Sequence, residues 1–156
     1  VRAAVNESDS FHDRFDAEVW LTDMSQRLAS KIPNPRQRLS ILRQVHYEAT
    51  RAGLPAELVL AVIDVESNFH RFAISPAGAR GLMQIMPFWL KEIGRPKANL
   101  FNTRTNLRIG CTILKYYLDQ EHGDLRKALA RYNGSYGNPH YPDRVFHLLS
   151  SRWFRQ

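Results

Sequence analysis

The sequence predicts a mainly α-helical domain built around one buried central helix, with at most a minimal β-hairpin. The central helix is expected where six apolar residues, Leu58 to Ile63, follow one another and leave no polar face. Elsewhere, apolar residues recur at helical spacing in segments separated by Gly, Pro and Asn. A chain of 156 residues can bury a single core. No stretch approaches the 18 or more continuous apolar residues of a membrane-spanning helix.

The order of the elements divides the chain in two. Residues 1–53 are expected to form a helical extension packed on the same domain as residues 54–156, which would hold the site. Within the extension, the polar and irregular residues 1–12 predict a loosely held arm. Helices are predicted over residues 14–31, 35–52, 54–66, 88–94, 103–121, 125–132 and 145–153.

Local signals justify the ends of these elements. Asn34 suits the N-cap and Pro35 the first position of the second helix, and Gly53 suits the position just after its end. Residues 67–81 mix aromatic side chains with Ser, Pro and Gly, which predicts a long loop with room for a minimal hairpin. Asp124 suits the N-cap of the short helix that follows it.

Composition narrows the classes of function. The net charge of +7 suits anionic partners such as nucleic acid, membrane surfaces or an acidic cell-wall polymer. The basic residues are scattered and form no groove-reading motif, so no nucleic-acid partner is expected. The single cysteine, Cys111, lies in an apolar helical stretch and is expected to be a small core residue. The histidines lack metal-ligand spacing and no phosphate loop is present, so neither a metal nor an organic cofactor is expected.

Glu66 is the candidate catalytic residue. It follows the apolar run at the C-terminal end of the central helix. Burial raises the pKa of a carboxyl group, because desolvation disfavours the charged form. A carboxylic acid kept protonated near neutral pH can donate its proton to a glycosidic oxygen. The competing interpretation is a helix-end glutamate that points into solvent.

Several other side chains carry groups that suit a saccharide. Ser67 can orient the Glu66 carboxyl or contact a substrate, and Gln84 offers both a donor and an acceptor to an acetamido group. Met83 is assigned with even weight to the core and to contact with a sugar face. Aromatic and amide groups for stacking and hydrogen bonding come from Tyr132, Asn133 and Tyr141.

Three ordered sequence blocks contain all of these residues except Tyr141, which follows the third block. They are E-S-x-F from Glu66, S-x-x-G-A-x-G-L-M-Q-I-M-P from Ser75, and A-x-Y-N-G from Ala130. Together, over roughly residues 54–149, they resemble the lytic transglycosylases of the bacterial cell wall, whose catalytic domain has a goose-type-lysozyme-like fold. The chain departs from the family in one respect: the segment from Gly134 to His140, between Asn133 and Tyr141, is shorter than the corresponding segment of the family usually is. The resemblance implies a glycan cleft lined by Ser67, Ser75, Met83, Gln84, Tyr132, Asn133 and Tyr141.

The resemblance also implies a reaction, with Glu66 as the sole acid/base. Cleavage of the MurNAc-β-1,4-GlcNAc bond of peptidoglycan would leave 1,6-anhydro-MurNAc ends. Glu66 would protonate the bond, the muramoyl acetamido oxygen would assist, and Glu66 would then take the proton of the 6-hydroxyl. Two-carboxylate mechanisms lack a convincing second member. Asp64 projects about 200° away from Glu66 on the helix. The remaining acids, Glu92 and Asp143, have a plain surface interpretation.

The alternatives are a hydrolytic lysozyme-type muramidase, a non-catalytic glycan-binding module of an envelope or secretion machine and, ranked last, a nucleic-acid binder. The expected partner is the glycan strand of peptidoglycan. An envelope or secretion-complex protein and a peripheral or lipid-anchored membrane association are left open. The expected location is the periplasm or cell envelope, although the chain starts at Val1 without an export signal.

Overall fold

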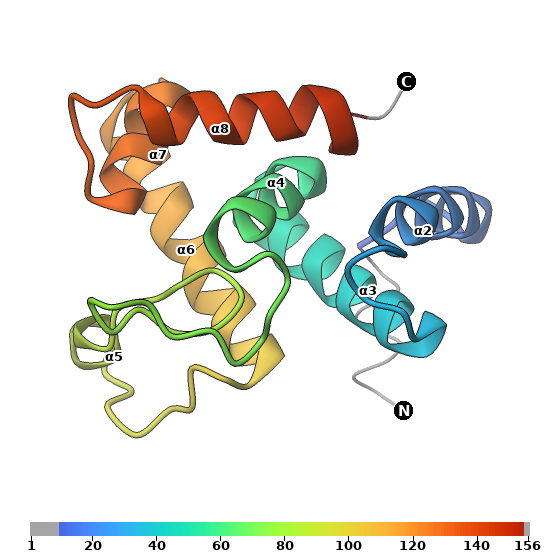
Figure 1. Ribbon diagram of the computed structural model, residues 1–156, viewed down its shortest axis with the longest axis horizontal. Coiled ribbons are helices and arrows are strands. Elements are labelled where there is room, and N and C mark those ends of the chain that lie inside the picture. Colours follow the sequence, from blue (N-terminus) through green and yellow to red (C-terminus); the bar gives the residue numbers. More distant parts are fainter. Residues whose placement is uncertain (1–9, 155–156) are drawn as a thin grey trace.

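The computed structural model describes residues 10–154, and these are mostly helical (Figure 1). Only isolated β-bridges accompany the helices in this part of the chain, so the predicted mainly α class is confirmed. The elements in chain order are α2 (Arg14–Leu28), α3 (Pro35–Ala52), α4 (Ala56–Ser67), α5 (Phe88–Glu92), α6 (Thr103–Gln120), α7 (Leu125–Asn133), α8 (His140–Leu148) and the π-helix η1 (Leu149–Trp153).

Helix α4 is the predicted central helix. Every residue from Leu58 to Asp64 is buried, and α4 packs against α3, α8 and η1 (Figure 1). Full burial of one Val, Leu or Ile side chain contributes roughly 1.5–3 kcal/mol to folding. Because the run from Leu58 to Ile63 has no polar face, burial on every side of the helix contributes to folding, and α4 is stable only where other helices surround it.

The predicted helix ends are confirmed where the capping groups are visible. The Asn34 side chain accepts hydrogen bonds from the backbone N–H of Arg36 at 2.9 Å and of Gln37 at 3.1 Å. Gly53 ends α3 with φ of +76°, a left-handed conformation that favours glycine. Asp124 caps α7 in the same way as Asn34 caps α3.

The last helix differs from its prediction, since α8 begins at His140 and not near Val145. Tyr141 and Pro142 therefore lie inside its first turn. The sequence does not indicate a helix that begins at His140, because Gly137, Asn138 and Pro139 before it favour a turn. The periodic apolar pattern starts only at Val145. The helix then continues through the π-helical turn η1, whose Trp153 is fully buried.

The expectation of a loosely held arm is wrong for residues 10–12, while residues 1–9 lie outside the described residues. The ring of Phe11 stacks on that of His46, with 3.6 Å between ring centroids. It also lies 5.7 Å from the ring of Trp20. These contacts tie the start of α2 to α3. The boundary after residue 53 stays a prediction, because α3 packs against both α4 and α6.

The loop between α4 and α5 forms the expected minimal hairpin as two isolated bridges. Ile74 pairs with Arg80, and Arg80 pairs with Ile85. Ser75 closes the bend between Ile74 and Arg80, since its backbone N–H donates to the carbonyl of Ala79 at 2.9 Å. The segment thus has a fixed path without a regular strand.

Asn106 of α6 holds this loop against the core. Its side chain is buried, and Nδ2 donates to the carbonyls of Arg80 at 3.0 Å and Leu100 at 2.8 Å. Oδ1 accepts from the backbone N–H of Met83 at 2.9 Å. Gly81, at φ of +79°, passes so close that a Cβ there would lie 2.3 Å from Nδ2. One amide therefore fixes two positions of this loop and the segment between α5 and α6.

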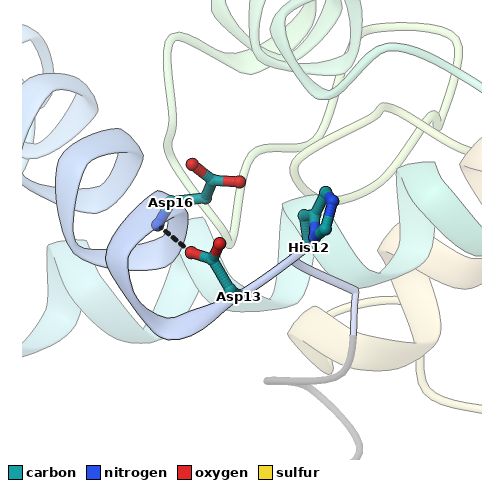
Figure 2. Close-up of side chains that lie close together, drawn as sticks. All are labelled: His12, Asp13 and Asp16. Atoms are coloured by element: carbon teal, nitrogen blue, oxygen red, sulfur yellow. Dashed lines mark hydrogen bonds between the residues drawn. The ribbon is translucent and has the colours of Figure 1, made fainter.

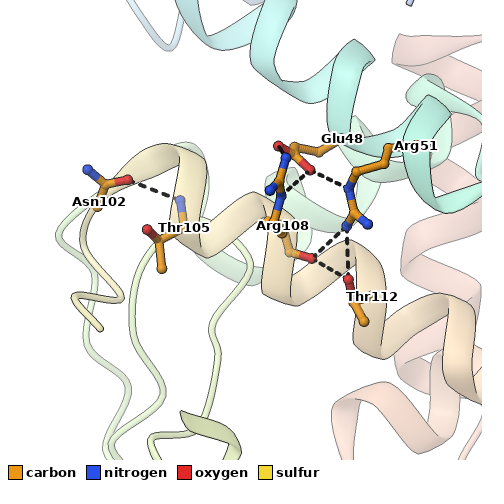
Figure 3. Close-up of polar contacts among 6 residues, drawn as sticks. All are labelled: Glu48, Arg51, Asn102, Thr105, Arg108 and Thr112. Atoms are coloured by element: carbon orange, nitrogen blue, oxygen red, sulfur yellow. Dashed lines mark hydrogen bonds and ion pairs between the residues drawn. The ribbon is translucent and has the colours of Figure 1, made fainter. Parts of the chain in front are cut away.

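A buried carboxylate joins α3 to α6 (Figure 3). Glu48 is 1% exposed and accepts from Nε of Arg51 at 2.8 Å and from Nε of Arg108 at 3.1 Å. Arg51 also donates to Oγ1 of Thr112 at 2.9 Å. Both guanidinium groups reach solvent on one side, so the cluster neutralises Glu48 without burying a second full charge.

Glu48→Gln is expected to lower the free energy of unfolding by about 2 kcal/mol, because both guanidinium groups lose their counter-ion and a single amide oxygen replaces two carboxylate oxygens as acceptor. Urea denaturation measures the change. Asp119→Asn is the matched control, since Asp119 forms an exposed ion pair with Lys115 on α6 and its removal should change stability by less than about 0.5 kcal/mol. Equal effects of the two substitutions would contradict this interpretation of the cluster.

Candidate active site

Glu66, one residue before the end of α4, lines a cavity of about 270 Å³. Helix α4 ends there because Asn68 and Phe69 both adopt left-handed conformations, with φ of +52° and +64°. The turn carries the Phe69 ring into the core, 5.6 Å from the ring of Trp153. The cavity is lined by Val65, Glu66, Asn133, Ser135, Asn138, His140, Tyr141 and Arg144.

Burial raises the pKa of Glu66 from 4.5 to about 7. Desolvation is the main cause, and the negative end of the α4 dipole acts in the same direction. Three groups oppose it and lower this pKa, in decreasing order the Tyr141 hydroxyl, the Asn133 amide and the Arg144 guanidinium. Near neutral pH, Glu66 can therefore release a proton and take one back.

The two tyrosines predicted for the site lie on either side of this carboxyl. Tyr132 donates its hydroxyl hydrogen to the backbone carbonyl of Met83 at 2.7 Å, which connects α7 to the loop. Tyr141 is buried, and its hydroxyl acts on the Glu66 carboxyl as a hydrogen-bond donor, although the contact falls outside strict hydrogen-bond geometry. It lies close enough to Glu66 to act on the pKa of that group, while burial raises the pKa of both tyrosines well above 10. Both phenols stay protonated and act as donors.

Ser67 and Met83 do not offer their side chains to the cavity. The hydroxyl of Ser67 is buried and donates to the carbonyl of Leu82 at 2.7 Å. Met83 is fully buried against Gly110 of α6, where an added Cβ would lie 2.4 Å from Sδ. The expectation that these two side chains contact a glycan is corrected. They support the loop next to Glu66, and Met83 is a core residue.

Gln84 and Ser75 are also used within the loop. Gln84 has φ of +54°, and its Nε2 donates to the carbonyls of Ala73 at 3.1 Å and Gly81 at 2.9 Å. The predicted donor role toward an acetamido group is therefore corrected, and only Oε1 is left to accept. Oγ of Ser75 accepts from the backbone N–H of Ala79 at 3.0 Å, which closes the bend.

Three expected residues, Glu66, Asn133 and Tyr141, thus line one cavity. Four further lining residues lie in the segment after α7 and in the first turns of α8 and were not predicted from the sequence: Ser135, Asn138, His140 and Arg144. A signal existed for Arg144, because it lies three residues after Tyr141 and so shares a helix face with it. No such signal existed for Ser135 and Asn138, which lie in irregular backbone.

Glu66 is the one carboxylate among the lining residues. Asp64 faces away, as predicted, and pairs with Lys31 at 3.4 Å and with Arg152 at 2.7 Å. It also accepts from Nε1 of Trp153 at 3.1 Å, so it joins α4 to the C-terminal turn. The two other acids considered are exposed: Glu92 and Asp143.

One group of potential metal ligands occurs in the described part of the chain, at the start of α2 (Figure 2). The ligand atoms of His12, Asp13 and Asp16 lie within 4.8 Å of one another. Asp13 already accepts from the backbone N–H of Asp16 at 2.8 Å as the helix N-cap. A hydrogen bond to its own backbone and the two carboxylates raise the pKa of His12. Helix capping explains this group, and the positive end of a helix disfavours a cation.

Among residues 10–154, no helix has both the length and the apolar content needed to cross a membrane.

Comparison with known proteins identifies the family of this chain. Residues 44–141 match the model of the transglycosylase SLT domain, a span that contains Glu66 and Tyr141. The membrane-bound lytic murein transglycosylase C of Mannheimia succiniciproducens is 38% identical over 88 residues, which are 51% of this chain and 24% of the relative. The same-named protein of Yersinia pestis is 32% identical over 119 residues, which are 66% of this chain and 32% of the relative.

Solved structures show the same likeness. An inactive mutant of the lytic transglycosylase Slt from Pseudomonas aeruginosa matches with a TM-score of 0.53 and 30% identity, over 69% of this chain and 18% of that chain. The 70-kDa soluble lytic transglycosylase in complex with bulgecin A matches with a TM-score of 0.56 and 24% identity, over 85% of this chain and 23% of that chain. The predicted lysozyme-like fold is confirmed. The chain spans a third or less of these proteins, and it belongs to the transglycosylase SLT-domain family.

Proposed function

We propose that this chain is the catalytic domain of a peptidoglycan lytic transglycosylase, which cleaves the MurNAc-β-1,4-GlcNAc bond and forms 1,6-anhydro-MurNAc ends. The observation that carries the proposal is the Glu66 carboxyl, with a pKa of about 7 in a cavity that it shares with no other carboxylate. The family membership supports the same reaction.

In the first step, neutral Glu66 donates its proton to the glycosidic oxygen, and the bond from that oxygen to the muramoyl anomeric carbon breaks. The acetamido oxygen of the same sugar bonds to the anomeric carbon, so the positive charge is not left on the ring. Desolvation favours this step, because it keeps the acid protonated until the substrate arrives.

In the second step, Glu66 is a carboxylate and acts as the base. The Tyr141 hydroxyl, the Asn133 amide and the Arg144 guanidinium all favour the ionised form, as their effect on the pKa of Glu66 indicates. The carboxylate takes the proton of the sugar's own 6-hydroxyl, whose oxygen attacks the anomeric carbon and displaces the acetamido oxygen. Glu66 is protonated again, and water is not consumed.

A hydrolytic muramidase would need a positioned water and, in the two-carboxylate mechanisms, a second acid. The nearest acid along α4, Asp64, is engaged by Lys31 and Arg152 on another face. This arrangement favours the non-hydrolytic route. The relatives are described as membrane-bound murein transglycosylases, so we place the chain in the cell envelope, with the periplasm as its compartment and peptidoglycan strands as its partner.

Glu66→Gln should lower the rate of glycan cleavage by at least about 100-fold, since the amide cannot donate a proton, while glycan binding is retained. Digestion of intact sacculi followed by mass spectrometry measures both rate and product. The wild-type product should be lighter than the hydrolysis product by one water. Glu92→Gln, at an exposed position of α5, is the control and should cleave at the wild-type rate. Reducing-end muramic acid as the only product would reject the transglycosylase reaction.

The pH profile of kcat/KM should fall above about pH 7, by about tenfold for each pH unit, because the free enzyme must carry a protonated Glu66. In Tyr141→Phe this limb should move to higher pH, because the hydroxyl that lowers the pKa of Glu66 is gone. The exposed Tyr116 of α6 gives the control, and Tyr116→Phe should leave the limb in place. A limb that stays fixed or moves to lower pH in Tyr141→Phe would contradict this assignment.

A further inference from the structure

The cavity that contains Glu66 is also lined by an arginine, Arg144. Arg144 lines the cavity from α8 and is exposed. Its charge lowers the pKa of both Glu66 and Tyr141, so the guanidinium lies near the reacting carboxyl. The other arginine of this region, Arg126, is paired with Asp143, whereas Arg144 forms no ion pair with a carboxylate of the described residues.

Beside this cation lies a hydroxyl without a partner. Oγ of Ser135 is buried and makes no hydrogen bond to any residue that the structure describes, although Ser135 lines the same cavity. A buried polar group left unpaired destabilises the folded protein. An unpaired hydroxyl in the same cavity as Arg144 indicates a position at which a polar ligand accepts hydrogen bonds from both residues.

The backbone around Ser135 is preorganised. The N–H of Ser135 donates to the carbonyl of Ala130 at 2.9 Å, and the N–H of Asn138 donates to the carbonyl of Ser135 at 2.9 Å. Oδ1 of Asn138 accepts from the N–H of His140 at 3.0 Å. The side-chain NH₂ of Asn138, which also lines the cavity, is left to donate. This short segment therefore holds two donors, the Ser135 hydroxyl and the Asn138 amide, with little freedom to lose on binding.

We propose that Ser135, Asn138 and Arg144 form a subsite for a carboxylate that the glycan carries beside the bond to be cleaved. A guanidinium, a hydroxyl and an amide all donate, and a carboxylate is a planar acceptor with room for all three. The carboxylate has two sources in peptidoglycan, the lactyl ether of a muramoyl residue without a peptide and the stem peptide of a substituted one. The inference rests on the proposed function, because it names the substituent that this cavity selects.

The protonation of Glu66 is compatible with such a ligand. While its carboxyl is neutral, no negative charge in the lining repels the incoming anion. The subsite would also place the muramoyl ring, and not a plain N-acetylglucosamine ring, on the acid. Selection would therefore appear mainly as an effect on binding and KM.

The experiment measures saccharide binding by calorimetry in a Glu66→Gln background, where turnover is absent. Three ligands are compared: a MurNAc–GlcNAc tetrasaccharide with free lactyl carboxylates, the same glycan bearing stem peptides, and a tetrasaccharide of N-acetylglucosamine. Adding Arg144→Gln should weaken binding of the first or second ligand about tenfold, as for the loss of one charged hydrogen bond. Binding of the third should change less than about twofold. The ligand that is weakened identifies the source of the carboxylate.

Two further variants test the separate roles of the positive charge and of the hydroxyl. Arg144→Lys keeps the charge and should retain most of the affinity, while Ser135→Ala should weaken the same ligand about threefold. The control is Arg36→Gln, which removes an equal charge at an exposed position of α3 and should leave all three affinities unchanged. Thermal unfolding checks that each variant is folded.

Equal weakening of all three ligands, or an equal effect of Arg36→Gln, would overturn the subsite. If saccharides bind and the wild type cleaves sacculi, but no carboxylate dependence appears, the subsite alone fails. If Glu66→Gln binds none of the saccharides and the wild type cleaves no glycan, the proposed function fails and the subsite with it.

Discussion

The desolvation of the Glu66 carboxyl is the constraint on which the site depends. Helix α4 has no polar face, so it lies within the core, and its penultimate residue is carried partly into the same apolar surroundings. The left-handed turn at Asn68 and Phe69 ends the helix before the carboxyl can reach open solvent. A pKa of about 7 results from this placement, moderated by the three polar groups that face it. Fold stability and proton chemistry therefore arise from the same apolar helix.

A second layer of residues acts through the backbone. Asn106 holds the loop from α6, Ser67 attaches it to the end of α4, and Tyr132 attaches it to α7. Two of these bonds meet at Met83, whose N–H and carbonyl are both used while its side chain fills the core. These bonds fix the loop relative to α4, α6 and α7, and so help to hold in place the two helices that carry Glu66 and Asn133.

The sequence predicts the helices, the central position of α4 and the orientation of Asp64 away from Glu66, because these follow from apolar periodicity, helix geometry and local caps. Side-chain partners in the loop could not be predicted, since the hydrogen bonds of Ser67 and Gln84 depend on a backbone path that no periodic pattern describes. Asn106 was predictable in part. It shares the buried stripe of α6 with Gly110, and a polar residue in such a stripe is normally hydrogen-bonded.

The approach of Gly110 to Met83 has a consequence for redesign of this domain. Helix α6 reaches the loop only because that position has no β-carbon, which would otherwise lie 2.4 Å from the sulfur. A methyl group added there would push the loop outward and, with it, the carbonyl that anchors Tyr132. Even the smallest side chain at position 110 would therefore disturb a loop to which Gly110 contributes no side-chain contact.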